Sequence, residues 1–289
     1  MPRDHRVWVV GAAAWDTVLY LDGRLELGRF TQSARTVERP GGSAANVAQA
    51  LAVSGVDTAF VSALGPDDRG RALEQALEAS GLRELVIAPT PGQSGHSIVV
   101  VDSSGDRTIL GVTPDVVPHI SLATAALQPG DIVVFVVWRE AFLPDLELAR
   151  ACGCVTVVGL AALEDPRAKA DVAFGSRADL AREPDISAHL ERFPRIVMTS
   201  GPDGASQWQT GEVLHQAAFP TRVVDTTGAG DSFLAGYLLM YARGLQGGRE
   251  ALEAGARWAA LMVSLEASVP PAWQEVLRMA LPDLAAASG

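Results

Sequence analysis

The sequence predicts an α/β fold: a doubly wound, mostly parallel sheet flanked by helices, with a small β-sheet lid. Two observations from the N-terminal third predict the main sheet. Val7–Val10 is a continuous apolar run that ends at Gly11, as in a strand buried on both faces. A helical period over 42–54, a strand pattern over 57–64 and a helical pattern over 69–80 follow. This alternation favours a parallel sheet with helices on both faces.

The same alternation resumes after residue 131, which extends the predicted sheet through the C-terminal half. Short apolar runs predict further strands, and an extended pair surrounds Gly211. Three helical patterns close the chain. The expected strands cover 132–138, 155–160, 171–174 and 195–200, and the expected helices cover 231–243, 249–264 and 272–281.

Two segments interrupt the alternation, and they predict the lid. Within 15–36, Thr17–Leu21 is β-prone, and Leu25 and Leu27 alternate with a polar residue beyond a turn signal. Within 91–115, extended runs over 95–102 and 106–112 flank a Ser-Ser-Gly turn.

We expect these two segments to form one small sheet over a main domain made of 1–14, 37–90 and 116–289. Two separate, solvated hairpins are the alternative. An exposed apolar lid face would allow two copies to pair as a homodimer.

Composition excludes several classes of protein. The net charge is −11 and basic residues form no run, which argues against nucleic-acid binding. No stretch of about 18 apolar residues occurs, so we expect no membrane span. The two cysteines exclude a disulfide framework and suit a reducing compartment, so we expect a cytoplasmic protein. Neither a Walker P-loop nor G-x-G-x-x-G occurs, which argues against P-loop NTPases and Rossmann dehydrogenases.

The run over 224–233, V-D-T-T-G-A-G-D-S-F, carries the strongest chemical signal. Gly228 and Gly230 allow a tight turn in which successive amides converge on an anion. A helix that begins near Gly230 adds free N–H groups and the positive end of its dipole. These donors would stabilise a transferring phosphoryl group, and the Asp231 carboxylate could accept a proton from a hydroxyl beside it.

The simpler interpretation of Asp231 is a carboxylate that caps a helix. Asp225, Thr226 and Thr227 lie just upstream, and a cap does not require them. A second run over 40–46, P-G-G-S-A-A-N, adds to the chemical interpretation. Its paired glycines would let a ligand approach the backbone, and the amide of Asn46 both donates and accepts, as sugar hydroxyls require.

Together the two runs resemble the two signatures of the ribokinase-like (pfkB) family of sugar and nucleoside kinases. They occur in the family's order, about 185 residues apart, and the resemblance covers nearly the whole chain. It implies ATP as phosphate donor, Mg²⁺ as cofactor, and a small sugar or nucleoside as acceptor. It also implies that Asp231 is the catalytic base and that Gly228, Ala229 and Gly230 form the anion hole for the γ-phosphate.

The resemblance implies further site residues by their matching positions. Substrate contacts are expected at Asp16, Gly41, Gly42 and Asn46, together with Asp231. The nucleotide is expected beside Ser176, Thr199, Gly201, Gly204 and Thr227, together with Gly228 and Gly230.

Two segments depart from the family pattern. Ser176-Arg177-Ala178-Asp179 stands where the family usually has Asn-x-x-Glu, which arranges magnesium-bound water and phosphates. A shorter carboxylate can still act through water, so Asp179 is the candidate magnesium ligand. The residues over 265–268, L-E-A-S, replace a segment that often contains glycine, so a monovalent cation stays an open option.

The sequence leaves the activity open in three respects. The same machinery would serve a nucleoside kinase as well as a sugar kinase. A non-catalytic ligand-binding homologue would keep the pocket and lose efficient transfer, which the change at Ser176 and Asp179 favours and the intact run over 228–231 opposes. A different α/β enzyme would use that run to bind another anion.

Overall fold

The computed structural model describes residues 5–278 except 106, 114, 246 and 268. Expected lid, helix and cation-site positions at 106, 114, 268 and 279–289 lie outside the described residues. The strands are β1 (Val7–Val10), β2 (Ala14–Tyr20), β3 (Arg35–Gly41), β4 (Thr58–Leu64), β5 (Glu84–Pro89), β6 (Gly95–Val101), β7 (Arg107–Gly111), β8 (Ile132–Phe135), β9 (Val155–Gly159), β10 (Val172–Ser176), β11 (Arg195–Thr199), β12 (Ala205–Gln209) and β13 (Glu212–Gln216). The α-helices are α1 (Ser43–Val53), α2 (Asp68–Glu78), α3 (Leu143–Ala151), α4 (Ala229–Ala242), α5 (Arg249–Met262) and α6 (Trp273–Arg278).

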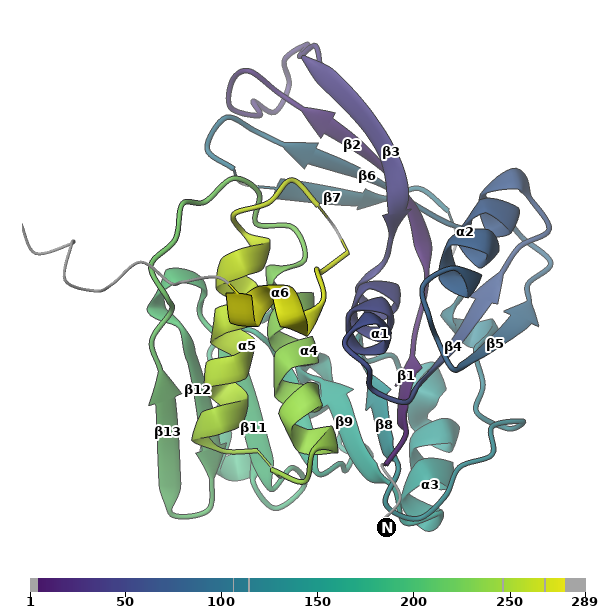
Figure 1. The fold of residues 1–289 in the computed structure, drawn as a ribbon, viewed down its shortest axis with the longest axis vertical. Helices are drawn as coiled ribbons and strands as arrows, with labels where there is room; N and C mark the ends of the chain where they lie inside the picture. The colour runs from purple at the N-terminus through teal and green to yellow at the C-terminus, as the bar shows by residue number, and fades with distance from the viewer. Residues whose placement is uncertain (1–4, 106, 114, 246, 268, 279–289) are drawn as a thin grey trace, which may run out of the picture.

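The main sheet has the strand order β13-β12-β11-β10-β9-β8-β1-β4-β5 (Figure 1). The neighbouring strands β11, β10, β9, β8, β1, β4 and β5 pair in parallel, and β12 and β13 add an antiparallel edge. The chain order reverses at β1, which lies between β4 and β8. In open α/β sheets, ligands bind outside the carboxyl ends of the strands at such a switch point. The expected doubly wound α/β class is confirmed.

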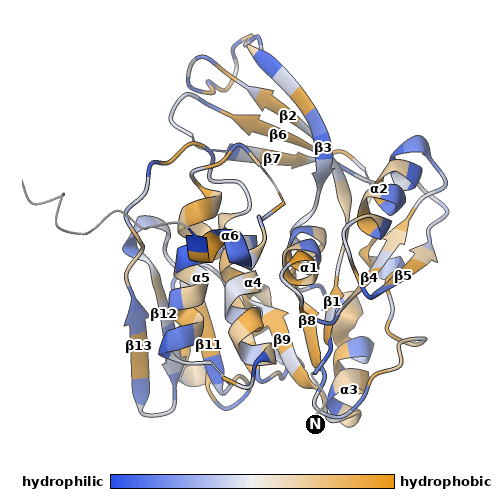
Figure 2. Cartoon of the chain, viewed as in Figure 1, coloured by the Kyte–Doolittle hydropathy of each residue, from blue (hydrophilic) through white to orange (hydrophobic). Residues whose placement is uncertain are grey.

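Side chains on the two faces of the sheet pack into two separate cores. In β1, Val7 and Val9 point into the core formed with α1, α4 and α5. Trp8 and Val10 point into the opposite core, which contains α3. All four are fully buried, as a central parallel strand requires. Figure 2 shows the central strands β1, β8 and β9 in predominantly hydrophobic colours.

The second sheet, with the order β3-β2-β6-β7, lies beyond the carboxyl end of β1 (Figure 1). β2 pairs antiparallel with β3 and parallel with β6, so the two expected lid segments are joined in one sheet. β7 adds an antiparallel edge. The inner face carries a small apolar cluster made of Val18, Val99 and Val101. The lid therefore closes off the edge at which the main sheet is expected to bind ligands.

One strand of the lid differs from the expectation. The expected extended pattern at Leu25 and Leu27 forms no strand, and Leu27 is almost wholly exposed. The partner of β2 is β3 instead, which runs up to and includes Gly41. An edge strand needs only one buried face, and β3 has the sequence R-T-V-E-R-P-G, with one aliphatic residue and a proline, so its apolar signal is weak.

Two glycines allow α4 and α5 to pack closely. A Cβ atom on Gly236 of α4 would lie 2.7 Å from the Ala254 carbonyl oxygen in α5. A Cβ atom on Gly255 of α5 would lie 2.7 Å from the ring of Phe233. No helix among those described is both long and apolar enough to span a membrane.

The Gly236 contact generates a stability prediction. We expect Gly236→Ala to lower the free energy of unfolding by about 1–3 kcal/mol, because the added methyl group forces α5 away from α4. Thermal denaturation measures the change. Gly23→Ala is the matched control, since a Cβ atom there meets nothing within 4 Å. Equal melting temperatures for the two variants would contradict the packing argument.

Candidate active site

The first turn of α4 begins at a left-handed glycine. Gly228 is the N-cap residue, with φ 75°, a conformation that glycine adopts without strain. The amide of Ser232 donates to the Gly228 carbonyl oxygen at 2.8 Å. Among the described residues, the amides of Gly230 and Asp231 have no backbone acceptor. The space beside the Gly230 Cα is open, so these amides and the helix dipole are free to bind an anion.

A hydrogen bond joins the first turns of α4 and α1. Nδ2 of Asn46 donates to Oδ2 of Asp231 at 2.8 Å. The chain enters α1 through Gly42, whose φ is 94° and where a Cβ atom would lie 2.8 Å from the Ala12 carbonyl oxygen. Glycine at this position therefore lets α1 start against the end of β1. The two sequence runs meet at this hydrogen bond.

Burial raises the pKa of the Asp231 carboxyl group. Hydrogen bonds from Asn46 and Ser43 and the positive charge of Arg107 oppose this rise, whereas the negative charge of Asp179 adds to it. A raised pKa makes the carboxylate a stronger base. The group is thus held in place by donors and remains a good proton acceptor.

Asp16 lies on β2 with its carboxylate against the backbone of Gly41. A Cβ atom on Gly41 would lie 2.0 Å from Oδ2 of Asp16, so only glycine leaves room for this side chain. Burial raises the pKa of Asp16 to about 6; Arg39 and Ser97 oppose the rise, and the charge of Asp231 adds to it. The carboxylates of Asp16 and Asp231 therefore influence each other's titration.

Buried polar atoms without partners gather in this region. Among the described residues, four buried side-chain atoms lack a hydrogen-bond partner: Oδ1 of Asn46, Oγ1 of Thr227, and Nε and Nη2 of Arg39. Such atoms are rare in folded proteins and call for an explanation. Asn46 and Thr227 belong to the two helix starts that meet here. The amide oxygen of Asn46 could accept a hydrogen bond from a ligand hydroxyl, and the hydroxyl of Thr227 could donate one to a phosphate.

The expected nucleotide residues follow the neighbouring strands β10 and β11. Ser176 pairs with Thr199 at the ends of these strands. Asp179 is exposed and accepts a hydrogen bond from the amide of Ser176 at 3.2 Å, and its charge reaches Asp231. Gly201 and Gly204 form a turn with positive φ at both positions. These residues share an edge of the sheet with Asp231, but no hydrogen bond or ion pair between described residues joins any of them to Asn46 or Asp16.

Several residues of the site were not predicted from the sequence. Arg107 of β7 donates to the carbonyl oxygen of Thr226, and Oγ1 of Thr226 donates to the Gly105 carbonyl oxygen at 3.2 Å. Ser43 and Ser97 hydrogen-bond to Asp231 and Asp16. Ser43 lies within the glycine-rich run over 40–46, so this run was the sequence signal that could have identified it. Arg107 and Ser97 carry no signal in the sequence, because only the pairing of the lid strands brings them to the site.

Comparisons with known proteins identify the family to which this chain belongs. Residues 4–274 match the model of the pfkB family carbohydrate kinases. The chain belongs to this family. The ATP-dependent ribose-1-phosphate kinase of Halopiger xanaduensis is 32% identical over 81% of this chain and 83% of its own. The nucleoside kinase of Methanothermobacter thermautotrophicus is 27% identical over 84% of this chain and 85% of its own.

A solved structure shares the fold. The ribokinase of Thermotoga maritima superposes with a TM-score of 0.73 at 22% identity, covering 94% of this chain and 97% of the other. The expected family, fold and enzyme class are therefore confirmed: this is a carbohydrate kinase of the pfkB family. The roles of its individual site residues stay predictions.

The coupled carboxylates of this kinase generate a prediction for pH dependence. Both pKa values are raised, so each group gains its negative charge only as pH rises, near 6 in the case of Asp16. We expect kcat/KM to fall as pH drops through about 6, because a protonated Asp231 cannot take up the substrate proton and a protonated Asp16 is a weaker hydrogen-bond acceptor than its carboxylate.

The variant Asp16→Asn tests the coupling in a pH–rate profile. It removes a negative charge near Asp231, so the remaining acidic limb should move to lower pH. An unchanged midpoint would show that the two groups titrate independently.

Proposed function

We propose that this kinase transfers the γ-phosphoryl group of ATP to a hydroxyl of a sugar or nucleoside, with Asp231 as general base. The observation that carries the proposal is the hydrogen bond from Asn46 to Asp231. It holds a carboxylate of raised pKa in the same helical turn as two amides that have no backbone acceptor among the described residues. A base and an anion site in one turn match what phosphoryl transfer to an alcohol requires.

The proposed reaction follows from these positions. The acceptor hydroxyl donates its proton to Asp231 as its oxygen attacks the γ-phosphorus. The bond from phosphorus to the bridging oxygen breaks, and ADP leaves. The amides at Gly230 and Asp231 and the helix dipole stabilise the charge on the transferring group. Asp16 accepts a hydrogen bond from another substrate hydroxyl, and Oδ1 of Asn46 accepts a further one.

Magnesium is proposed as the cofactor that neutralises the phosphates. Among the described residues, no three acidic, histidine or cysteine side chains form a metal cluster. One exposed carboxylate, that of Asp179, lies within electrostatic reach of Asp231. This donor set fits Mg²⁺ held mainly by nucleotide phosphates and water, which is how the ion is often bound in kinases.

We propose that the acceptor contains a ribose unit. The relatives described above are named for ribose-1-phosphate, nucleosides and ribose, and these compounds share a ribose ring. The polar acceptors available here, Asp16 and Asn46, suit neighbouring ring hydroxyls. The base attached to the ribose, or a phosphate on it, would then distinguish the substrate from related compounds.

Turnover with a panel of acceptors tests this function. We expect ADP formation that depends on ribose, ribose-1-phosphate or a nucleoside, whereas dependence on fructose alone would contradict the proposed ribose unit. Asp231→Asn should lower kcat by about 10²–10⁴-fold, because it removes the proton acceptor and keeps the size of the side chain. Binding of ATP and acceptor, measured by calorimetry, should persist.

Asp68→Asn is the matched control, since Asp68 is also a carboxylate in the first turn of a helix, α2, but is exposed. It should leave kcat unchanged. Ligand binding without turnover in the unmodified protein would support the non-catalytic alternative. Full activity of Asp231→Asn would exclude that residue as the base.

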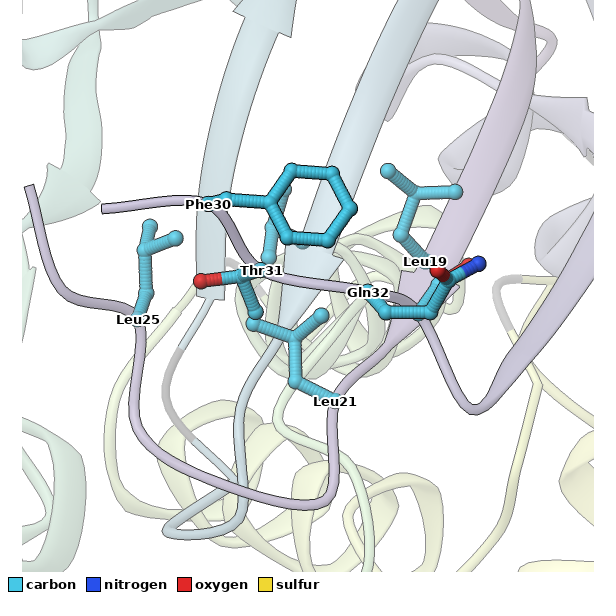
Figure 3. Close-up of a pocket in the computed structure, with 8 residues that line it drawn as sticks. Leu19, Leu21, Leu25, Phe30, Thr31 and Gln32 are labelled. Atoms are coloured by element: carbon cyan, nitrogen blue, oxygen red, sulfur yellow. The ribbon is translucent and has the colours of Figure 1, made fainter. Parts of the chain in front are cut away.

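The outer face of the lid supports a proposed homodimer. Figure 3 shows a hollow there, beside β2 and the loop that follows it, in which Leu19, Leu21, Leu25 and Phe30 surround open space. Phe30 is 91% exposed. An apolar surface of this kind is more favourable when covered.

The mass in solution tests the homodimer. Light scattering should give twice the mass of one chain, and Phe30→Asp should shift the protein towards the monomer because it adds charge to the covered face. Leu277→Asp, at an exposed leucine of α6, is the control and should leave the mass unchanged. A monomer at all concentrations would contradict the proposal.

A further inference from the structure

A buried carboxylate stands directly before the proposed anion hole. Asp225 has no exposed side-chain surface. Its Oδ1 accepts a hydrogen bond from the amide of Thr227 at 2.8 Å, which fixes the backbone just before Gly228. The amides of Val224 and Asp225 in turn donate to the carbonyl oxygen of Val263 at the end of α5. The carboxylate thus helps to set the course of the chain into α4.

A buried negative charge requires a positive charge close by. Arg39 of β3 supplies it: Nη2 lies 3.7 Å from Oδ2 of Asp225, and the arginine side chain is only 13% exposed. Nε and Nη2 of Arg39 have no hydrogen-bond acceptor among the described residues. The guanidinium group therefore acts here as a buried charge more than as a paired hydrogen-bond donor. The same charge opposes the rise in the pKa of Asp16.

A monovalent cation does not fit beside this carboxylate. The segment that the family resemblance associates with such an ion borders a hollow against β3, lined in part by Arg35, Arg39, Glu266 and Ala267. Arg35 pairs with Glu266 at 2.8 Å and lies over the ring of Tyr20. Two guanidinium groups already face this hollow. An added cation would be repelled by both, and the nearest carboxylates are already paired.

We infer that Arg39 takes the place of a monovalent cation in this kinase. The tethered guanidinium group neutralises Asp225 and thereby positions the loop that leads to Gly228. Arg39 is a positioning residue, because it acts on the reaction through Asp225. It lies on the same strand as Gly41 and opposite Asp16 in register, so it also links the substrate side of the lid to the phosphate side of the site. Catalysis then needs no added potassium or sodium. This inference rests on the proposed function for its kinetic test.

The unmodified protein gives the first test. Tetramethylammonium chloride is replaced by KCl at constant ionic strength. We expect kcat and KM to change less than twofold and the melting temperature to change by less than about one degree. A several-fold rise in kcat, with a higher melting temperature in KCl, would overturn the inference. The melting temperature reports on cation binding without turnover. Failure of the proposed function, seen as no turnover with any acceptor, is therefore distinguishable from failure of the inference.

Replacing the arginine gives the second test. Arg39→Met should lower kcat at least tenfold while KM for ATP changes little. KCl or millimolar guanidinium chloride should restore part of the activity, because either supplies the missing charge. Arg39→Lys should retain most of it. Rescue distinguishes a missing charge from general damage to the fold, and absence of rescue by either cation would overturn the inference.

Arg35→Met is the matched control, since Arg35 lies four residues earlier on the same face of β3 and is about half exposed. It should show normal kcat and no activation by KCl. If Arg39→Met does not fold, Arg39→Lys decides: near-normal kcat without activation by KCl supports the inference, and activation by KCl contradicts it.

Discussion

The hydrogen bond between Asn46 and Asp231 is the contact on which the arrangement of the site depends. It can form because α1 and α4 lie in the same core and both begin at the carboxyl edge of the sheet. Glycine with positive φ precedes each helix, at Gly42 and Gly228, so the chain can turn sharply from the edge into the helix. A parallel sheet thus brings together two helix starts that are 185 residues apart.

Charge balance between the lid and the main domain is the second constraint. The main domain contributes the carboxylates of Asp225 and Asp231. The lid contributes the positive charges that compensate them: Arg39 pairs with Asp225, and the charge of Arg107 acts on Asp231. The lid also carries Asp16, whose pKa is raised by burial and by the charge of Asp231. Proton affinity at the proposed base therefore depends on the lid lying over the site, since Arg107, whose charge opposes the rise in the pKa of Asp231, comes from a lid strand.

Features encoded in consecutive residues were predicted from the sequence, and features that depend on distant parts of the chain were not. Strands such as Val7–Val10 and helix α4 were predicted because buried apolar runs and helical periods are written in consecutive residues. β3 was missed because an exposed edge strand with polar residues and a proline has almost no apolar period. Asn46 and Asp231 were predicted from their motifs. Arg107 and Ser97 were not, since only strand pairing in the lid brings them near the carboxylates.

The sequence by itself determined the fold class, the family and the two helix starts that carry the glycine runs. These properties rest on local spacing: glycines where the backbone must turn, and apolar residues at the period of a strand or helix. Only the tertiary structure decided which charges compensate the buried carboxylates. The partner of Asp225 is an arginine 186 positions earlier in the chain, and that pairing exists because β3 folds back beside β2. Coulombic partners are selected by distance in space, which spacing along the chain does not encode.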